Sequence, residues 1–240
     1  MEGIDKNKLP KHIAITMDGN GRWAKTKGKL RIFGHKNGVK AVRDTVEGAA
    51  KIGIKFLTLY AFSSENWNRP EKEVNALMTL LVSAINKETK TLMNNNIRLC
   101  TIGDINKLPS KAQKELQEAI TKTKDNTRMT LVLALSYSGR GEIINAVQNI
   151  IKDGKKPEEI NEDTFQQYLT TKSVPDPELL IRTSGEYRIS NFLLWQIAYS
   201  ELYFTNTLWP DFRKADLYKA ILNYQNRERR FGKTTEQLQK

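Results

Sequence analysis

The sequence is poor in the residues that build disulfide frameworks and imidazole metal clusters. Its 240 residues include one cysteine, Cys100, and two histidines, His12 and His35. A single thiol excludes an internal disulfide framework and a cysteine-based zinc site. Two imidazoles are too few for most metal sites built on histidine. The candidates for chemistry are therefore sought among other residue types.

Long apolar runs and linker-like segments are also missing. No apolar run approaches the roughly 20 residues of a membrane-spanning helix, and residues 1–8 lack the apolar stretch of a signal peptide. We therefore expect a soluble, cytoplasmic protein. The chain has no internal repeat, no low-complexity tract and no Gly/Ser/Pro-rich linker, which predicts one domain over residues 1–240, with flexible ends at 1–10 and 233–240.

Acidic residues are outnumbered. The chain has 39 Lys and Arg against 27 Asp and Glu, a formal charge of +12. Such an excess indicates an acidic partner, which can be a nucleic acid, anionic lipid or a phosphorylated small molecule.

The apolar pattern alternates between two textures. Short, nearly continuous runs rich in branched residues are typical of strands buried on both faces of a parallel sheet; they cover residues 12–17, 56–62, 97–102, 129–135, 179–181 and 202–204. Helical spacing fills the intervals at 37–52, 71–93, 110–124, 141–152, 162–170 and 215–230. Strand and helix in alternation predict an α/β fold with a central, mostly parallel sheet flanked by helices.

Unusual polar residues follow several of these strands. They are Asp18-Gly-Asn-Gly-Arg-Trp23, Ser63-Ser-Glu-Asn-Trp-Asn-Arg69, Tyr137-Ser-Gly-Arg140 and Arg182-Thr-Ser-Gly-Glu-Tyr-Arg188. Open parallel sheets bind ligands at the carboxyl ends of their strands, so these residues are interpreted as one site. Glycines, hydroxyls, carboxylates and arginines at one edge suit an oxyanion-rich ligand with a divalent metal.

The first of these segments carries the most specific chemistry. Gly19 and Gly21 permit a sharp turn and expose backbone amides to phosphate, while Arg22 adds a bidentate donor. Asp18 is placed to hold a magnesium ion that bridges phosphate oxygens. The same four residues also occur in ordinary strand-to-helix turns. They match neither a Walker loop nor the dinucleotide-binding fingerprint.

Other candidates are interpreted by their neighbours. Trp23 and Trp67 lie in polar turns, where an aromatic ring beside arginine suits a ligand with an apolar part, although capping of the core is as good an explanation. His35, close in sequence to Arg31, can donate to phosphate, although a single histidine more often has a structural role. Arg182 and Arg188 flank a second possible phosphate cradle, and Glu201 precedes an apolar run, where a carboxylate is costly unless it is paired or bound to metal.

Several long motifs occur together in a consistent order. They are His12-Ile-Ala-Ile-Thr-Met-Asp-Gly-Asn-Gly-Arg-Trp-Ala24 with Arg31 and His35, then Leu59 to Pro70, Asp176 to Glu186, Arg188 to Gln196, Glu201 to Phe204 and Trp209 to Phe212. Over about residues 12–232 the chain resembles the cis-prenyltransferases.

The resemblance implies a homodimer, a hydrophobic tunnel and Mg²⁺-dependent condensation of isopentenyl diphosphate with an allylic diphosphate, usually farnesyl diphosphate. The implied product is a long-chain polyprenyl diphosphate of the undecaprenyl type, a precursor of the lipid carrier for cell-wall synthesis. Such a product is delivered to the membrane, so the enzyme is expected to work in the cytoplasm or peripherally at the inner membrane face.

The resemblance also assigns roles to residues. Asp18 is the essential acid and a metal ligand, together with Glu201. The allylic diphosphate is bound by Gly19, Asn20, Gly21, Arg22, Trp23, Arg31 and His35, and the pocket is lined by Ser63, Ser64 and Glu65. Asn66, Trp67 and Arg69 belong to a mobile catalytic loop. Isopentenyl diphosphate is held by Arg182, Arg188, Ile189 and Ser190, and Arg230 and Gly232 reach across the dimer.

Two positions qualify the resemblance. Family members commonly carry Asn-Tyr-Gly-Gly-Arg where this chain has Ser136-Tyr-Ser-Gly-Arg140, and serine adopts positive φ less readily than glycine. The family's loop asparagine is Asn66, but a carboxamide oxygen is barely basic, so we expect it to orient substrate or relay to the released diphosphate rather than act as a base.

Two other classes of function fit the composition less well. A nucleic-acid-binding protein is suggested by the net charge, but the lysines look scattered along the chain and the notable arginines lie beside carboxylates. A metal-dependent phosphohydrolase would share the diphosphate cradle but needs neither the Trp-Asn loop nor an apolar tunnel. A trans-prenyltransferase is excluded because the Asp-Asp-x-x-Asp clusters of that all-helical class do not occur.

Overall fold

Six parallel strands form one central sheet. The computed structural model describes residues 3–232 and 234–238, so residues 1–2, 233 and 239–240 of the expected flexible ends lie outside the described residues. The strands are β1 (His12–Thr16), β2 (Phe56–Ser63), β3 (Ile97–Ile102), β4 (Met129–Tyr137), β5 (Leu179–Arg182) and β6 (Glu201–Phe204). Their order across the sheet is β3-β4-β2-β1-β5-β6, and every pairing is parallel. The predicted α/β class is confirmed.

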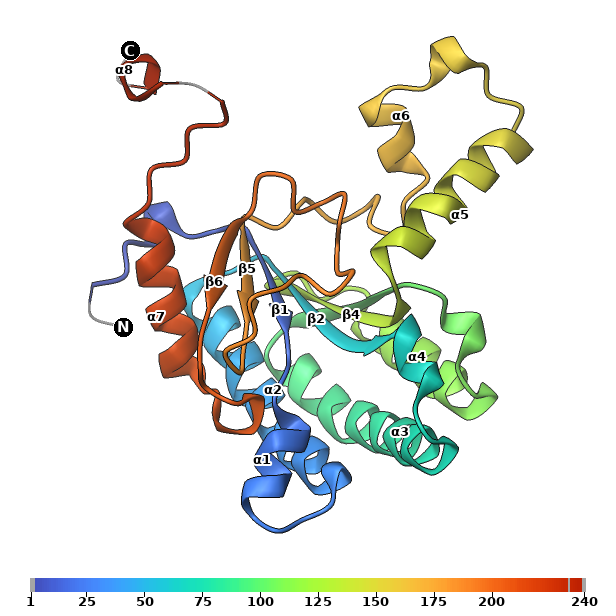
Figure 1. Ribbon diagram of the computed structural model, residues 1–240, viewed down its shortest axis with the longest axis vertical. Helices are drawn as coiled ribbons and strands as arrows, with labels where there is room; N and C mark the ends of the chain where they lie inside the picture. Colours follow the sequence, from blue (N-terminus) through green and yellow to red (C-terminus); the bar gives the residue numbers. More distant parts are fainter. Residues whose placement is uncertain (1–2, 233, 239–240) are drawn as a thin grey trace.

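Helices connect these strands and cover the sheet (Figure 1). They are α1 (Asn20–Thr26), α2 (Arg31–Ile52), α3 (Glu71–Asn94), α4 (Ser110–Thr123), α5 (Gly139–Lys152), α6 (Glu162–Gln167), α7 (Lys214–Gln225) and α8 (Thr235–Leu238). Short 3-10 turns lie at η1 (Lys6–Lys8), η2 (Ser64–Asn68), η3 (Ile105–Lys107), η4 (Pro157–Glu159) and η5 (Trp209–Asp211). No helix in the described part of the chain is both long and apolar enough to cross a membrane.

The largest departure from the expected helices is the start of α2. The helix begins at Arg31 rather than at residue 37, and it contains Gly34 and Gly38. A Cβ atom at Gly34 would lie 1.9 Å from the backbone oxygen of Asn20 in α1. Gly34 and Gly38 therefore allow α1 to pack closely against α2. At the other end of the chain, α7 ends at Gln225 rather than at residue 230, because Arg227 turns back to β6 and bonds Glu201.

Alternation along the strands divides the core between the two faces of the sheet. Ile13 and Ile15 of β1 belong to the larger apolar cluster, which they share with α2, α3, α4 and α7. Ala14, between them, faces a smaller cluster with Phe192 of the segment that follows β5. This two-residue period, with both faces covered, explains the nearly continuous apolar runs of the sequence.

His12 is a structural histidine at the start of β1. Its ring is buried, and its two nitrogens lie 2.6 Å from the backbone oxygen of Pro175 and 2.7 Å from Oγ1 of Thr58. Burial lowers the pKa of His12 to about 4, against a smaller opposing effect of the Pro175 carbonyl. The ring is therefore neutral at physiological pH.

The strand order fixes where a ligand binds. From β1 the chain moves to β2 on one side, whereas β5 and β6 are added on the other side. The loops that leave β1 and β5 diverge at this reversal, which is where open parallel sheets leave a crevice. Asp18 follows β1 and Arg182 ends β5, so the two residues meet there.

Candidate active site

An ion pair joins the loops after β1 and β5. Oδ2 of Asp18 lies 3.0 Å from Nη2 of Arg182. The Asp18 side chain is 35% exposed and that of Arg182 only 4%. Thr183 fastens the same junction, since its hydroxyl accepts from the backbone N–H of Asp18 at 2.9 Å and donates to the backbone oxygen of Asp18 at 2.7 Å. The arrangement leaves the carboxylate open to a ligand while the arginine is fixed beneath it.

Gly19 makes the turn after Asp18 possible. Its φ is +106°, in the left-handed region, and its N–H donates to Oδ1 of Asp18 at 2.6 Å. A Cβ atom there would lie 2.9 Å from Cδ2 of Leu208 and 3.0 Å from Cβ of Ser184. Only glycine satisfies both the backbone angle and the close approach, so the turn predicted from the sequence also has a steric basis.

The buried guanidinium of Arg182 organises the loop beyond β5. Its Nη1 donates to the backbone oxygen of Arg188 at 2.6 Å and to Oγ of Ser190 at 2.7 Å, while its Nε has no partner among the described residues. Ile189, between these two residues, packs against the smaller apolar cluster. Arg182, Arg188 and Ser190 are thus brought together, as the sequence predicted.

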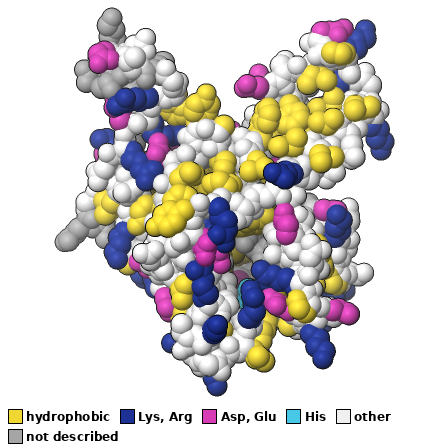
Figure 2. All heavy atoms as spheres, in the orientation of Figure 1, with side chains coloured by type: hydrophobic (Ala, Val, Ile, Leu, Met, Phe, Trp, Pro, Cys, Tyr) yellow, Lys and Arg dark blue, Asp and Glu magenta, His cyan; other side chains and the backbone are white. Residues whose placement is uncertain are grey.

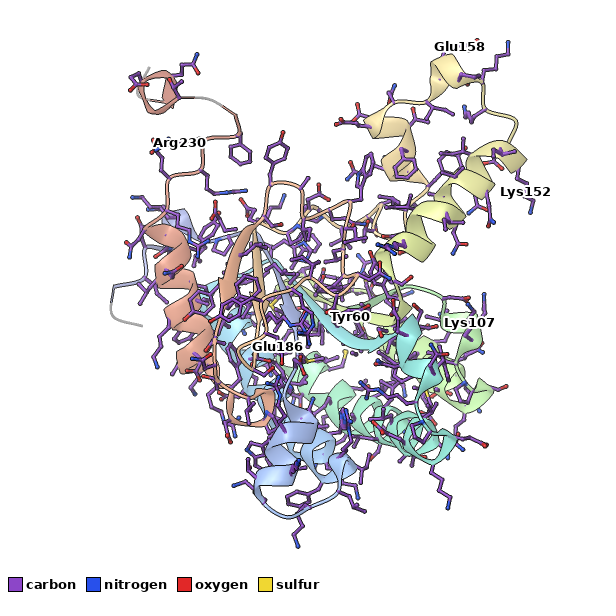
Figure 3. All side chains as sticks on the ribbon, in the orientation of Figure 1. Tyr60, Lys107, Lys152, Glu158, Glu186 and Arg230 are labelled. Atoms are coloured by element: carbon purple, nitrogen blue, oxygen red, sulfur yellow. The ribbon has the colours of Figure 1, made fainter. Side chains whose placement is uncertain are left out.

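Glu186 was not assigned a role from the sequence, yet it holds two of the site's arginines. Its carboxylate lies 3.0 Å from Nη2 of Arg22 and also pairs with Arg188, and Arg22 bonds the hydroxyl of Ser184 as well. Figure 3 shows Glu186 near the centre of the molecule, by the strand ends. The signal available was its place in the polar Arg182–Glu186 segment. Because Glu186 neutralises arginines that an incoming diphosphate could bind, it competes with such an anion.

A second cationic cluster surrounds Glu73 at the start of α3. Arg69 lies 3.0 Å and Arg31 3.6 Å from Oε1 of this carboxylate. Gly21 faces the cluster, since a Cβ atom there would be 3.0 Å from Nε of Arg31. His35 lies beside these groups; burial first, then the charges of Arg69 and Arg31 against that of Glu73, lower the pKa of His35 to about 4. A neutral imidazole can donate one N–H to a phosphate oxygen.

The segment after β2 is held in place by hydrogen bonds and packing of its side chains. Oδ1 of Asn66 accepts from the backbone N–H of Ser63 at 3.2 Å and caps η2. Nε1 of Trp67 donates to Oγ of Ser136 at 2.9 Å, and the Trp67 ring meets Phe62 edge-on at 4.8 Å. The carboxamide oxygen of Asn66 is therefore already engaged, which supports our expectation that this residue positions groups rather than removing a proton.

Asn191 connects three loops of the site and was missed by the sequence analysis. Its Nδ2 donates to Oε1 of Glu65 at 2.7 Å, and its Oδ1 and backbone oxygen accept from Arg140 and Gly139 at 2.8 and 2.7 Å. Partial burial opposes ionisation of Glu65, but its hydrogen bonds, that of Asn191 foremost, hold its pKa below the usual value. Glu65 also accepts from the hydroxyl of Ser64. In the structure Asn191 has a φ of +61°, which asparagine tolerates better than most residues, but the sequence itself held no signal for these contacts.

This chain has serine at positions 136 and 138, where family members commonly have asparagine and glycine. The serine at position 138 causes no backbone strain. Ser138 is extended, with φ −151°, and its hydroxyl accepts from Gly141 N–H at 3.1 Å to cap α5. Positive φ falls instead on Ser136, at +49°. The doubt raised from the sequence about strain at Ser138 is thus resolved, because serine there acts as a helix cap.

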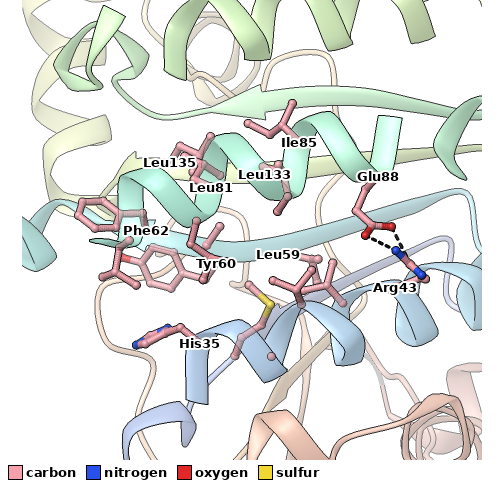
Figure 4. Close-up of a pocket in the computed structure, with 18 of the residues that line it drawn as sticks. His35, Arg43, Leu59, Tyr60, Phe62, Leu81, Ile85, Glu88, Leu133 and Leu135 are labelled. Atoms are coloured by element: carbon pink, nitrogen blue, oxygen red, sulfur yellow. Dashed lines mark hydrogen bonds and ion pairs between the residues drawn. The ribbon is translucent and has the colours of Figure 1, made fainter. Parts of the chain in front are cut away.

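An apolar pocket opens beside the cationic groups. It has a volume of about 250 Å³ and lies between α2, α3 and the sheet (Figure 4). Its lining includes Val42, Leu59, Leu81, Ala84, Ile85 and Leu133. His35 lies at one end of the pocket, and the ion pair between Arg43 and Glu88, with distances of 2.8 and 2.5 Å, lies at the other. The pocket occupies the place of the expected tunnel, and a continuous tunnel stays a prediction.

Of two further predicted residues, Asn20 lines the polar end of this pocket and Trp23 lies outside its lining. The Trp23 ring stacks on Phe33 at 5.8 Å, with Nζ of Lys27 at 4.8 Å from its centroid. Asn20 lines the pocket, and its buried Oδ1 has no partner among the described residues. Asn20 therefore has an acceptor left for a ligand.

Three predicted residues are not brought to the site within one chain. Glu201 begins β6 in register with Leu179, so it lies at the opposite end of the strands from Arg182, roughly 10 Å along the sheet. It pairs with Arg227 at 2.8 Å. Arg230 pairs with Glu228, and Figure 3 places Arg230 on the C-terminal extension, away from the strand ends. Gly232 comes two residues later, and no atom of the described residues lies within 4 Å of its Cβ position.

The donor set at the site suits magnesium in one particular way. No group of three or more His, Cys, Asp or Glu side chains that could enclose a metal ion exists among residues 3–232 and 234–238. Mg²⁺, however, is commonly bound by one or two carboxylates together with substrate phosphates and water. The part-exposed Asp18 carboxylate, with arginines and a backbone amide beside it that are able to hold phosphate, fits that mode.

This chain resembles proteins of one family in both sequence and structure. Residues 16–232 match the prenyltransferase family model for undecaprenyl diphosphate synthase. The chain is 56% identical to an isoprenyl transferase of Chlorobaculum tepidum, over 96% of this chain and 88% of that protein. It is 56% identical to a ditrans,polycis-undecaprenyl-diphosphate synthase, (2E,6E)-farnesyl-diphosphate specific, of Pasteurella multocida, over 97% and 98% of the two chains. The solved structure of lavandulyl diphosphate synthase from Lavandula x intermedia, in complex with dimethylallyl diphosphate, superimposes with a TM-score of 0.92 at 37% identity, covering 95% of this chain and all 100% of the other.

Proposed function

Because this chain belongs to the undecaprenyl diphosphate synthase family and is a cis-prenyl chain-elongating transferase, we propose that it condenses isopentenyl diphosphate repeatedly onto farnesyl diphosphate with Mg²⁺. The product is a long-chain polyprenyl diphosphate of the undecaprenyl type. One observation carries the proposal: the cationic edge opens directly onto an apolar pocket, since His35 and Asn20 line that pocket themselves. Phosphate hydrolysis needs no such pocket.

The two cationic clusters suit two diphosphate groups. Arg31, His35 and Arg69, with the backbone amides after Gly19, lie at the mouth of the pocket and suit the allylic diphosphate, whose hydrocarbon enters the pocket. The loop held by Arg182, with Arg188 and Ser190, suits isopentenyl diphosphate. Each added isoprene carbon excluded from water contributes about 0.8 kcal/mol, so the pocket favours chain growth.

Catalysis then depends on charge placed before the reaction begins. The C–O bond of the allylic diphosphate breaks, the alkene of isopentenyl diphosphate forms the new C–C bond, and a proton leaves to restore a double bond. Arginines and amides fixed at the strand ends stabilise the negative charge that develops on the departing diphosphate. When bound by Asp18 and phosphate oxygens, Mg²⁺ would neutralise part of the same charge. Asn66, held in its cap, orients the reacting groups.

Residues that lie outside the site in one chain bear on the expected homodimer. Among the described residues of one chain, Glu201 pairs with Arg227 and Arg230 with Glu228, and neither is paired with the Asp18 loop. Their proposed roles as a metal ligand and as a diphosphate-binding group therefore require a second copy of the protein. We propose, further, that the protein works in the cytoplasm and releases its lipid product to the membrane.

The test is direct. Purified protein is incubated with radiolabelled isopentenyl diphosphate, farnesyl diphosphate and Mg²⁺, and the butanol-extractable lipid is analysed by mass spectrometry. Label in a long polyprenyl diphosphate that disappears in the Asp18→Asn variant is the expected result. Release of inorganic phosphate without labelled lipid would indicate a phosphohydrolase, and neither product would overturn both.

A further inference from the structure

Positive charge is concentrated in one hairpin of the molecule. Residues 20–40, here called the basic hairpin, comprise α1, the turn after it and the first part of α2. They contain seven Lys and Arg and no Asp or Glu, which is more than half of the net charge of +12 in about a tenth of the chain. The five lysines of this hairpin lie with α1 at one end of the molecule's long axis (Figures 1 and 2), while the other lysines stay distributed over the rest of the chain.

Most of this charge is not neutralised by the protein. Arg22 and Arg31 pair with Glu186 and Glu73. Lys25, Lys29, Lys36 and Lys40 are exposed and take part in no ion pair among the described residues. Unpaired lysines on one small surface create a strong positive potential that attracts anions.

Apolar side chains lie among these lysines. Leu30, at the turn between α1 and α2, is 80% exposed, the most exposed large apolar side chain described, and Phe33 is 37% exposed. A single exposed leucine is ordinary, but one at a turn flanked by Lys29 and Arg31 combines the two features that anchor peripheral proteins to lipid. The Trp23 ring already stacks on Phe33 and lies under Nζ of Lys27, contacts that compete with the stacking of a nucleic-acid base.

We propose that the basic hairpin docks the enzyme on a membrane surface that carries anionic lipid. The lysines meet lipid headgroup phosphates, and Leu30, with the edge of Phe33, enters the headgroup layer. Asn20 and His35 belong to the same hairpin and line the polar end of the pocket. Docking through this hairpin therefore turns the opening of the pocket toward the lipid surface that takes up the product.

Membrane docking by the basic hairpin does not depend on the proposed enzymatic activity. Only the biological use of docking, delivery of the lipid product, rests on the proposed function. Vesicle binding is measured without any substrate, so a failure to bind leaves the enzymatic proposal intact. Conversely, a protein that binds vesicles but makes no polyprenyl product keeps the docking surface and loses the proposed function.

The experiment compares two matched triple variants of the full chain by vesicle co-sedimentation. The first, Lys25→Gln/Lys29→Gln/Leu30→Ser, alters the hairpin without touching residues assigned to substrate binding. The control, Lys111→Gln/Lys114→Gln/Ile160→Ser, removes the same charge and one exposed aliphatic side chain elsewhere. Vesicles contain either equimolar phosphatidylcholine and phosphatidylglycerol or phosphatidylcholine alone, and both variants are first shown to melt like the wild type.

We expect the wild type to bind the anionic vesicles, to release them in high salt, and to bind phosphatidylcholine weakly. The hairpin variant should bind anionic vesicles roughly a hundredfold more weakly, since it loses two basic contacts and one inserted side chain, whereas the control changes less than threefold. Its elongation of soluble substrates should be unchanged. No binding by the wild type, or equal losses in both variants, would overturn the proposal. If RNA binding is measured in parallel, a hairpin variant that loses binding to RNA but keeps its binding to vesicles would also overturn the proposal.

Discussion

The apolar pocket makes the length of the product sensitive to a single side chain of α3. Ala84 lines the pocket of about 250 Å³ into which we propose that the product chain grows. Ala84→Leu adds an isopropyl group that fills part of this space. Each five-carbon unit kept from water is worth about 4 kcal/mol, at about 0.8 kcal/mol per carbon group. A unit that loses its place in the pocket is therefore disfavoured by roughly a thousandfold, at about 1.4 kcal/mol per factor of ten.

We expect Ala84→Leu to shorten the main product by one or more isoprene units while the first condensation keeps its rate. The measurement is the product distribution from farnesyl and isopentenyl diphosphates, by mass spectrometry after phosphatase treatment, together with the rate of the first addition.

Ala76 supplies the matched control. It is half-buried on the same helix but does not line the pocket, so Ala76→Leu makes the same chemical change at a different position. Its products should keep the wild-type length. If a folded Ala84→Leu enzyme also gave the wild-type distribution, the chain would not grow through this pocket, and the argument from its volume would fail.

Three further outcomes test other parts of the structure. Asn66→Asp, which keeps an acceptor for the cap, should retain most of the turnover, whereas Asn66→Ala should lose at least tenfold; a fully active Ala variant would remove any role for this residue in catalysis. Burial lowers the pKa of His12 to about 4, below the roughly 6.5 of an unfolded chain, so the unfolded state binds more protons between these pH values. The free energy of unfolding should therefore fall as the pH drops from about 6.5 to 4, by up to about 3 kcal/mol for this group. Urea titrations of the His12→Gln variant should show a shallower fall. Gly34→Ala should destabilise the fold by about 3 kcal/mol or more, because its Cβ would lie 1.9 Å from a backbone oxygen of α1; a wild-type melting temperature would show that α1 moves aside freely.

The sequence sufficed for the fold class because the local signals agreed with one another. The strand at 97–102 was predicted to the residue, and α3 differs by one residue at its end, since buried strands and an amphipathic helix with Pro70 before it leave strong patterns. The start of α2 was lost because Gly34 and Gly38 weaken the helical signal. What they signal instead, contact with α1, depends on a partner that is close only in the folded protein.

The sequence predicted which charged residues lie at the candidate site, but not the hydrogen bonds and ion pairs that join them. Asp18 and Arg182 could be placed at one edge of the sheet, because the carboxyl ends of parallel strands share that edge. That Glu186 would hold the arginines, or that Asn191 would reach Glu65, could not be derived, since these contacts join segments distant in sequence through the turns of two loops. The volume of the pocket likewise depends on how α2, α3 and the sheet meet.

The Asp18–Arg182 ion pair and the Arg43–Glu88 ion pair belong to separate structural units. The first unit consists of loops anchored in the central strands, and the second consists of side chains that project from two neighbouring helices. Substitutions of aliphatic pocket-lining side chains on α2 and α3 therefore leave the Asp18–Arg182 ion pair in place. During evolution, such a scaffold can acquire new product sizes by exchanging a few aliphatic residues while its bond-forming chemistry is inherited unchanged.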